Sequence, residues 1–227
     1  MLQGRNIRKW YYNESDENLI FTRKGTIIEE YPFIKEHLLQ FYNNLKPKKT
    51  SDEKFGRKPG IYKWFEILDN TAYYREFERS EKIIWGLTAD KWAFTLDRER
   101  HYLPSNGYIL TSTKISTHYI LGLLNCKLMH YYFRFIGIMT AGGAYTLKAA
   151  TISALPFKIA KNTDEIAGIV KRILSKKENN HDTDVNKEET EIDRLVYHLY
   201  GLTYDEVLII DPTPPFTREE YERETRK

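Results

Sequence analysis

Basic side chains stand next to aromatic ones in several short stretches of the chain. Residues 5–12 read Arg-Asn-Ile-Arg-Lys-Trp-Tyr-Tyr, residues 57–64 read Arg-Lys-Pro-Gly-Ile-Tyr-Lys-Trp, and Lys91-Trp92 follows. Guanidinium and ammonium groups bind phosphate oxygens, Arg and Lys can also reach the edge of guanine, and aromatic rings can stack on bases. Taken singly, each ring could equally pack in the core beneath a solvated cation. The set together favours a nucleic-acid partner.

The distribution of charge is compatible with the same partner. The chain of 227 residues has a net charge of only +3, yet the stretch from Arg100 to Ala160 holds six Lys or Arg and no Asp or Glu. Carboxylates that face phosphates would weaken binding, so a surface that meets a polyanion should lack them. A stretch that is mostly core would also lack acids. The sequence leaves both explanations open.

Motifs for catalysis and metal binding are missing from the sequence. There is no nucleophile elbow, and Gly142-Gly143 is followed by Ala-Tyr-Thr-Leu-Lys rather than by the Gly-Lys-Ser/Thr of a nucleotide-binding loop. The six histidines are scattered, without the spacing that places two metal ligands on one face. We therefore expect no catalytic residue, no metal site and no cofactor in this chain.

Cysteine usage and hydropathy bear on the compartment. A single cysteine, Cys126, excludes an internal disulfide framework and favours a reducing cytoplasm. No stretch approaches the roughly 20 apolar residues of a membrane span, and the N-terminus lacks the apolar region of a signal peptide. We expect a cytoplasmic protein with no membrane partner.

Hydrophobic periodicity predicts an α+β fold, with a curved, mostly antiparallel sheet, packed helices and a helical C-terminal appendage. We expect strands at Ile61–Ile67, Lys82–Leu87, Ala93–Leu96 and Gly107–Thr111. Helical spacing covers Tyr119–Phe135 and also Glu29–Leu45, where Phe33 and Phe41 fall on one face.

The composition changes after Lys161. Helices are predicted from Thr163 to about Lys176, over Glu188–Tyr200, and from Thr203. We expect Lys177–Asn186 to be a flexible linker and the charged tail after residues 211–215 to be frayed. The predicted domains are residues 1–160 and, as the helical appendage with its charged tail, residues 161–227.

Strings in a fixed order along the chain resemble a known family. They are Gly4-Arg5-Asn6-Ile7-Arg8-Lys9-Trp10, Leu19-Ile20-Phe21-Thr22-Arg23-Lys24-Gly25, Gly56-Arg57-Lys58, Tyr62-Lys63-Trp64-Phe65-Glu66, Lys82-Ile83-Ile84-Trp85, Asn106-Gly107-Tyr108-Ile109-Leu110, Leu121-Gly122-Leu123-Leu124-Asn125-Cys126-Lys127-Leu128, Gly142-Gly143-Ala144-Tyr145 and Leu155-Pro156-Phe157. Together they resemble the TaqI-like C-terminal specificity domain of adenine-specific type IIG restriction–modification enzymes. The stretch from Asp193 to Leu202 resembles the helix that commonly follows that domain.

The resemblance implies that residues 1–160 form a target-recognition domain that reads the sequence of double-stranded DNA. It implies a larger parent protein whose methyltransferase domain binds S-adenosylmethionine and methylates adenine N6 on an extruded base, with Mg²⁺ where the parent also cleaves DNA. The Asn-Pro-Pro-Tyr/Phe motif of that catalytic domain is absent here. The chain would therefore carry the specificity of the parent enzyme without catalysis of its own.

Basic residues at predicted turns are the candidate DNA contacts, because the family reads bases from loops around its core. We expect contacts to the DNA backbone from Arg23, Lys24, Arg57, Lys58 and Lys63. We expect base reading from Arg98, Arg100, Lys114, Tyr145 and Lys148.

Two other functions stay open at this point. The chain could be a protein-interaction module that joins subunits of a DNA-modifying complex through its aromatic surfaces and acidic helical end; its binding would then be insensitive to salt. It could also be an enzyme whose site local motifs do not reveal. Binding of S-adenosylmethionine by the chain itself would indicate that alternative.

Overall fold

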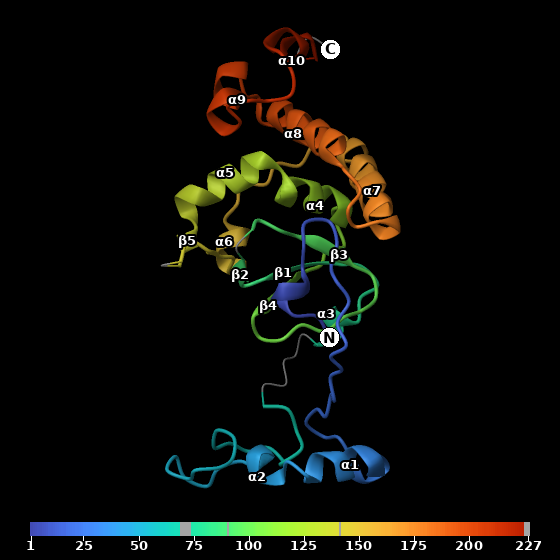
Figure 1. Cartoon of the computed structure of the whole chain (residues 1–227), viewed down its shortest axis with the longest axis vertical. Helices are drawn as coiled ribbons and strands as arrows, with labels where there is room; N and C mark the ends of the chain where they lie inside the picture. Colours follow the sequence, from blue (N-terminus) through green and yellow to red (C-terminus); the bar gives the residue numbers. More distant parts are fainter. Residues whose placement is uncertain (69–73, 90, 141, 225–227) are drawn as a thin grey trace. The chain divides into compact units, whose positions relative to one another are not determined.

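The computed structural model describes residues 1–68, 74–89, 91–140 and 142–224 and divides the chain into two compact units (Figure 1). The first unit comprises Met1–Asp16 and Glu76–Lys227, and the second comprises Glu17–Arg75. The chain thus leaves the first unit after its N-terminal residues and returns to it at Glu76. The first unit contains residues on both sides of residue 160, where the sequence predicted a domain boundary; that division stays a prediction.

Two small antiparallel sheets lie in the first unit, and the predicted α+β class is confirmed. The sheets are β3–β1–β4, formed by Thr95–Asp97, Lys82–Gly86 and Gly107–Leu110, and β2–β6–β5, formed by Thr88–Ala89, Tyr145–Thr146 and Ile138–Met139. All of β1 is buried, because its alternating side chains pack in two different clusters. Ile83 and Trp85 belong to the large core cluster, whereas Ile84 packs with Leu2 and Ile7.

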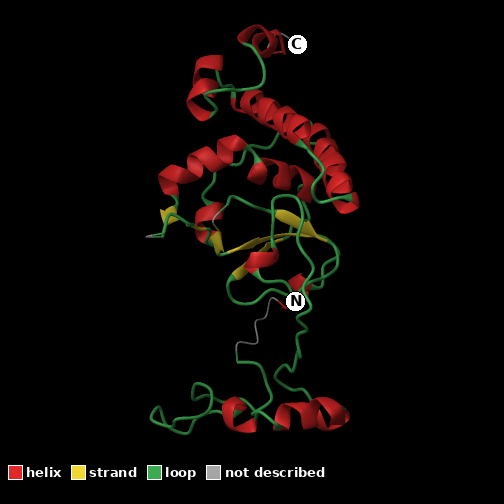
Figure 2. Ribbon diagram, viewed as in Figure 1, coloured by secondary structure: helices red, strands yellow, loops and turns green. Residues whose placement is uncertain are grey.

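Helices stack on one side of these strands (Figure 2). The helices α4 (Thr117–Asn125) and α5 (Lys127–Ile136) lie between the strands and the longer pair α7 (Asp164–Asn179) and α8 (Asn186–Tyr200), as Figure 1 shows. A short helix, α6 (Ala149–Ser153), follows β6. The large core cluster runs through strands and helices, so α7 and α8 contribute to the same core as β1.

The helix predicted over Tyr119–Phe135 is interrupted at one residue. Cys126 has extended backbone angles, with φ −74° and ψ 156°, and separates α4 from α5. A distant side chain begins the second helix, because the Asp193 carboxylate accepts the backbone N–H of Lys127 at 2.8 Å. Such a carboxylate at a helix N-terminus compensates an N–H that has no partner within the helix. Periodicity alone did not reveal the break, because the apolar spacing continues through it.

Up to Glu224 the C-terminal segment is folded, contrary to the predicted flexible linker and frayed tail. The helix α7 continues to Asn179, and His181 in the short connection to α8 stacks on Tyr11 with ring centroids 4.4 Å apart. Beyond α9 (Tyr204–Ile210), the Pro-rich run leads to α10 (Arg218–Glu224). The side chains of Phe216 and Tyr221 are buried against Tyr197 and Val207.

In the second unit the single helix predicted over Glu29–Leu45 is divided into three pieces. They are a 3-10 helix η2 (Ile28–Glu30), α1 (Pro32–Leu39) and α2 (Tyr42–Leu45). Pro32 occupies the first turn of α1, where its missing N–H costs nothing. The apolar face is not packed in a core, since Phe33 is 84% exposed and no residue of α1 or α2 is buried. The strand predicted at Ile61–Ile67 is a series of turns.

Two groups in the first unit titrate in opposite directions. Burial lowers the pKa of His130 to about 4 and raises the pKa of Asp193 to about 6, from ordinary values of 6.5 and 3.8. The stability linked to His130 is present above pH 6.5 and is lost as pH falls through about 4. The stability linked to Asp193 is present below pH 3.8 and is lost as pH rises through about 6. Between these values the two contributions oppose each other.

Asp193→Asn is therefore expected to expose the dependence on His130. As pH falls from about 6.5 to about 4, the free energy of unfolding of the variant should drop by about 1 to 3 kcal/mol more than that of the wild type. Urea denaturation at several pH values measures the difference. Adding His130→Gln to the Asp193→Asn variant should remove this extra loss of unfolding free energy at low pH. Parallel pH profiles of Asp193→Asn and the wild type would show that this pair does not set the dependence.

A search of the described helices finds none that is both long and apolar enough to cross a membrane.

Candidate nucleic-acid interface

The five residues predicted to contact the DNA backbone all lie in the second unit. A buried carboxylate, Glu66, organises the turns that carry them. Its Oε1 accepts the backbone N–H of Gly25 at 3.2 Å, and its Oε2 accepts the backbone N–H of Lys63 at 2.9 Å. Lys24 and Lys58 line one cavity of about 390 Å³ together with Glu66. The structure thus brings two of the predicted cations together and fixes the backbone of a third.

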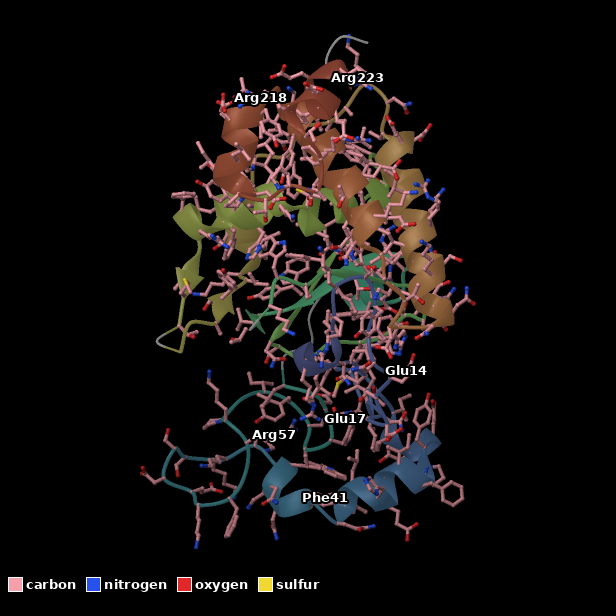
Figure 3. All side chains as sticks on the ribbon, turned by 45° about the horizontal axis from the view of Figure 1, so that its top comes forward. Glu14, Glu17, Phe41, Arg57, Arg218 and Arg223 are labelled. Atoms are coloured by element: carbon pink, nitrogen blue, oxygen red, sulfur yellow. The ribbon has the colours of Figure 1, made fainter. Side chains whose placement is uncertain are left out.

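The side chain of Arg57 links two segments of the second unit by hydrogen bonds to their backbone carbonyls. Its Nε donates to the carbonyl of Leu45 at 2.6 Å, and one Nη donates to the carbonyl of Trp64 at 2.9 Å. The guanidinium also lies 4.8 Å from the ring centre of Tyr62, and burial lowers the pKa of Arg57. Figure 3 marks Arg57 on the loop that follows α2. These contacts give Arg57 a structural role, to which a phosphate contact would be an addition.

Arg23 is placed by aromatic contact. Its guanidinium carbon lies 4.1 Å from the ring centre of Tyr74 and 5.8 Å from that of Phe21. A cation over a ring face is attracted by the quadrupole of the ring and loses part of its conformational freedom. Arg23 is therefore held in place at the surface of the second unit.

The predicted base-reading residues lie in the first unit, and two of them share one turn. Arg98 and Arg100 follow β3 directly, and the carboxylate of Asp97 holds their backbone. Asp97 accepts the backbone N–H groups of Glu99 and His101, both at 2.9 Å, and contacts the His101 ring at 3.0 Å. Arg100 has a positive φ of 58°, a conformation that costs a residue with a side chain about 1 kcal/mol.

A fully buried ion pair anchors this turn. The Nζ of Lys82 lies 2.5 Å from Asp97 Oδ2, and neither side chain is exposed. The same ammonium donates to the carbonyl of Phe77 at 2.7 Å. Lys82 and Asp97 are opposite each other in the β1–β3 register, so the pair joins the two strands where the Arg98–Arg100 turn begins.

Arg98 is engaged by acidic side chains in the first unit. Its guanidinium lies 2.8 Å from a carboxylate oxygen of Glu178 and 3.9 Å from one of Glu81. Lys114 lines a cavity of about 560 Å³ that Glu81 also lines, together with hydroxyl groups of the loop before α4. The structure thus places Arg98 and Lys114 in the surroundings of one carboxylate. Base reading by Arg98 would have to replace its ion pairs.

Tyr145 and Lys148 form a separate group in the β6–α6 segment. The hydroxyl of Tyr145 lies 3.3 Å from His130 Nε2, and its half-buried ring packs edge-on against Phe133. Lys148 is exposed and immediately precedes α6. Lys148 is therefore exposed and accessible to DNA, whereas the ring of Tyr145 is partly packed in the core.

Two of the three tryptophans that the sequence grouped with basic residues, Trp10 and Trp92, are core residues, and so is Trp85. The indole N–H of Trp10 donates to the carboxylate of Glu189. The indole N–H of Trp85 donates to the carbonyl of Leu147 at 2.8 Å, and that of Trp92 donates to the carbonyl of Leu124 at 2.5 Å. These rings pack in the core rather than lying open for stacking on bases.

The acid-free stretch from Arg100 to Ala160 contains both buried core and a basic surface, the two explanations that the sequence left open. Nearly every residue of α4 is buried, as expected for core. The six basic residues of the stretch are exposed, and Lys127 among them pairs with Asp211 at 2.6 Å. The lack of acids thus reflects core in α4, while the cations reach the surface.

The buried carboxylates that organise the basic turns were missed by sequence reasoning. Asp97 directly precedes Arg98, and Glu66 follows Lys63 by three residues, so both resemble solvated acids in the sequence. The signal that distinguishes them is spatial: Asp97 pairs with Lys82 of the neighbouring strand, and Glu66 accepts the N–H of Gly25 from a separate turn. No spacing rule in a single sequence would have identified them.

The fold and these turns define an α+β domain that presents basic residues from turns fixed by buried carboxylates. The described residues contain no group of three or more His, Cys, Asp or Glu that could hold a metal ion. A family model, the TaqI-like C-terminal specificity domain, matches residues 1–157, and the chain belongs to this family. No curated protein matches the chain. The resemblance found in the sequence is confirmed, and the family supports target recognition in restriction–modification rather than catalysis in this domain.

Proposed function

We propose that this chain reads the sequence of duplex DNA for a type II adenine-N6 methyltransferase, with or without an endonuclease, of which it is the C-terminal recognition part. The observation that carries the proposal is the family match over residues 1–157. The parent's catalytic domain would bind S-adenosylmethionine, and Mg²⁺ where it cleaves. The chain would contribute the choice of target.

The arrangement of the basic turns supports this proposal. Sequence reading requires side chains held at fixed positions, since each immobilised side chain otherwise costs entropy on binding. The turn with Arg98 and Arg100 is held by Asp97, and the turns with Lys24 and Lys63 are held by Glu66. The cations therefore project from backbone that is ordered before DNA arrives.

Selection from a randomised duplex library tests the proposal directly. The chain is expected to enrich a defined sequence, and the logarithm of its affinity for duplex DNA should fall linearly with the logarithm of the salt concentration. Binding of the enriched duplex should exceed binding of a scrambled duplex at equal salt. No enrichment, together with no salt-dependent affinity for any duplex, would overturn the proposal.

Arg100 is expected to contribute to the choice of target. Arg100→Ala should lower the preference for the selected sequence by about 1 to 3 kcal/mol, the value of a good bidentate base contact. Competition between selected and scrambled duplexes measures this change.

Arg100→Gly is the matched control for the backbone. It removes the same guanidinium but suits the positive φ of 58°, so it should be more stable than Arg100→Ala while losing the same discrimination. Unchanged discrimination in both variants would remove Arg100 from the base-reading set.

A second candidate function is contact with another protein through the second unit. Phe33, Phe55 and Ile61 are 84%, 55% and 99% exposed. A contiguous patch of exposed apolar side chains is typical of an interaction surface. Replacing Phe33 and Phe55 by serine should leave the DNA affinity of the chain unchanged and weaken its association with the parent's catalytic domain, which a pull-down with that domain measures.

A further inference from the structure

A basic cavity lies in the first unit, and its described lining includes none of the ten residues named from the sequence as candidate DNA contacts. It has a volume of about 560 Å³ and is formed by the N-terminal segment and by the chain around β2. Its cationic lining comes from Arg5, Arg8, Lys9 and Lys91, and the described lining includes no acidic side chain. Trp92, which is 7% exposed, forms part of its wall.

The wall of this cavity is built by close contact between two backbone segments. Gly4, in the 3-10 helix η1 (Gly4–Asn6), packs on Gly86 at the end of β1. A Cβ on Gly86 would lie 2.9 Å from the Cα of Gly4, which is closer than side-chain carbons approach other atoms. Only glycine allows this approach, so the N-terminal segment is fixed on the sheet and carries Arg5 and Arg8 with it.

The turn that follows is also fixed. Trp10 has a positive φ of 75°, its N–H donates to the carbonyl of Phe94 at 3.1 Å, and its indole binds Glu189. The cost of this backbone conformation is offset by burial of the ring. The ring enters the core, whereas Lys9 and Arg8 line the cavity.

The interactions of Arg8 and Lys9 orient their side chains. One Nη of Arg8 donates to the carbonyls of Arg5 and Ile7, at 2.7 and 2.9 Å, which fixes the plane of the guanidinium. The Nζ of Lys9 pairs with Glu189 at 2.9 Å, so part of its charge is compensated. Lys91 is exposed. Among the described residues, Arg8 donates to carbonyls and no acid pairs with Lys91, so positive charge in excess remains at these two side chains, where it attracts an anion.

Ring contacts connect the cavity to a predicted base-reading residue. Trp92 stacks on His130, with ring centroids 5.2 Å apart and planes 16° from parallel. The Nε2 of His130 lies 3.3 Å from the hydroxyl of Tyr145. An anion in the cavity would therefore sit on the same packed cluster of rings that positions the β6 segment.

We propose that this cavity binds a phosphate of the DNA backbone. The proposal rests on the proposed function, because duplex DNA is the phosphate-bearing partner. It adds Arg5, Arg8 and Lys91 to the backbone contacts and places a phosphate next to the β6–α6 segment, where it fixes the register of Tyr145 and Lys148 on the DNA.

The charge at Lys91 can be changed in the folded chain. The one cysteine, Cys126, is buried, and burial raises the pKa of its thiol to about 12, so it does not react with thiol reagents. In Lys91→Cys, aminoethyl methanethiosulfonate restores a positive charge at the introduced thiol, and the sulfonatoethyl reagent installs a negative one. Lys187→Cys is the matched control, because Lys187 is also exposed but lines a cavity with Glu188, Glu191 and Glu220.

The unmodified Lys91→Cys chain is expected to bind scrambled and selected duplexes about fivefold more weakly at roughly 0.15 M salt, with a salt slope lower by about one. The aminoethyl group should restore affinity, and the sulfonatoethyl group should weaken it further. Inorganic phosphate alone serves as a second probe: at constant ionic strength it should compete with duplex DNA for the wild-type chain and lose this effect in Lys91→Cys. Binding of phosphate that depends on Lys91 but does not compete with duplex DNA would assign the cavity to free phosphate instead and overturn the DNA assignment.

The outcomes separate this proposal from the one it rests on. If the wild-type chain binds no duplex, the proposed function fails. If the wild type binds DNA with a salt dependence but the three charge states at position 91 bind equally, or change as those at position 187 do, the cavity proposal alone is overturned.

Discussion

Asp97→Asn is expected to lower the free energy of unfolding by about 3 to 5 kcal/mol, the cost of leaving a buried charge without its partner. Lys82 and Asp97 are both fully buried, so the ammonium cannot reach water when the carboxylate is removed. Asparagine also has the wrong hydrogen-bonding groups. Both carboxylate oxygens face backbone donors, from Glu99 and His101, so the amide nitrogen would meet an N–H on either side.

Urea denaturation measures this effect, and an exposed ion pair provides the control. Arg172 and Glu191 are 2.9 Å apart, with side chains 54% and 38% exposed. Arg172→Gln should cost less than about 1 kcal/mol. A double replacement, Lys82→Met with Asp97→Leu, should recover part of the loss because no buried charge remains. An Asp97→Asn variant as stable as Arg172→Gln would contradict the role of the pair.

Tyr221→Ala is expected to release α10 from the first unit. The ring of Tyr221 is 1% exposed, stacks on His198 with centroids 4.1 Å apart, and its hydroxyl donates to the carbonyl of Leu202 at 2.8 Å. Truncation of a buried aromatic side chain costs about 3 to 5 kcal/mol. The helix is too short to persist by itself, so the loss should appear as local undocking.

Hydrogen exchange measures this undocking. Amides of α10 should exchange about a hundredfold to a few thousandfold faster in Tyr221→Ala, since about 1.4 kcal/mol corresponds to a factor of ten. Tyr221→Phe keeps the ring and should lose only the hydrogen bond, about 1 kcal/mol. Exchange in wild-type α10 at the rate of an unstructured peptide would instead restore the frayed tail that the sequence predicted.

Local pattern predicted those elements whose signal lies within a few residues. The strand at Lys82–Gly86 and the helix that ends before Gly201 both follow from such signals, and Gly201 adopts the positive φ of 70° that a helix end favours. The single helix predicted over Glu29–Leu45 is divided in the structure, because its packing depends on residues far along the chain. Its apolar spacing was real, but Phe33 has no core to enter in the second unit.

Some features of the candidate interface are also visible in the sequence, whereas others depend on distant contacts. Basic residues beside aromatic ones are visible in the sequence, and so are the ordered strings that identify the family. Which rings are buried is not visible, because Trp10 and Trp92 enter the core only through carbonyl or carboxylate partners far along the chain. Which cations are already engaged, as Arg57 and Arg98 are, depends on the same distant contacts.

The sequence by itself determined the family, the α+β class and the basic character of the turns, because these depend on residue type and on spacing along the chain. The tertiary structure decided that Asp97 and Glu66 organise those turns, that Tyr221 is core, and that residues 4–9 meet residues 86–93 around a basic cavity. The physical reason is burial. A carboxylate, a ring or a cation acquires its role from what folding places beside it, and those neighbours are tens of residues away in the sequence.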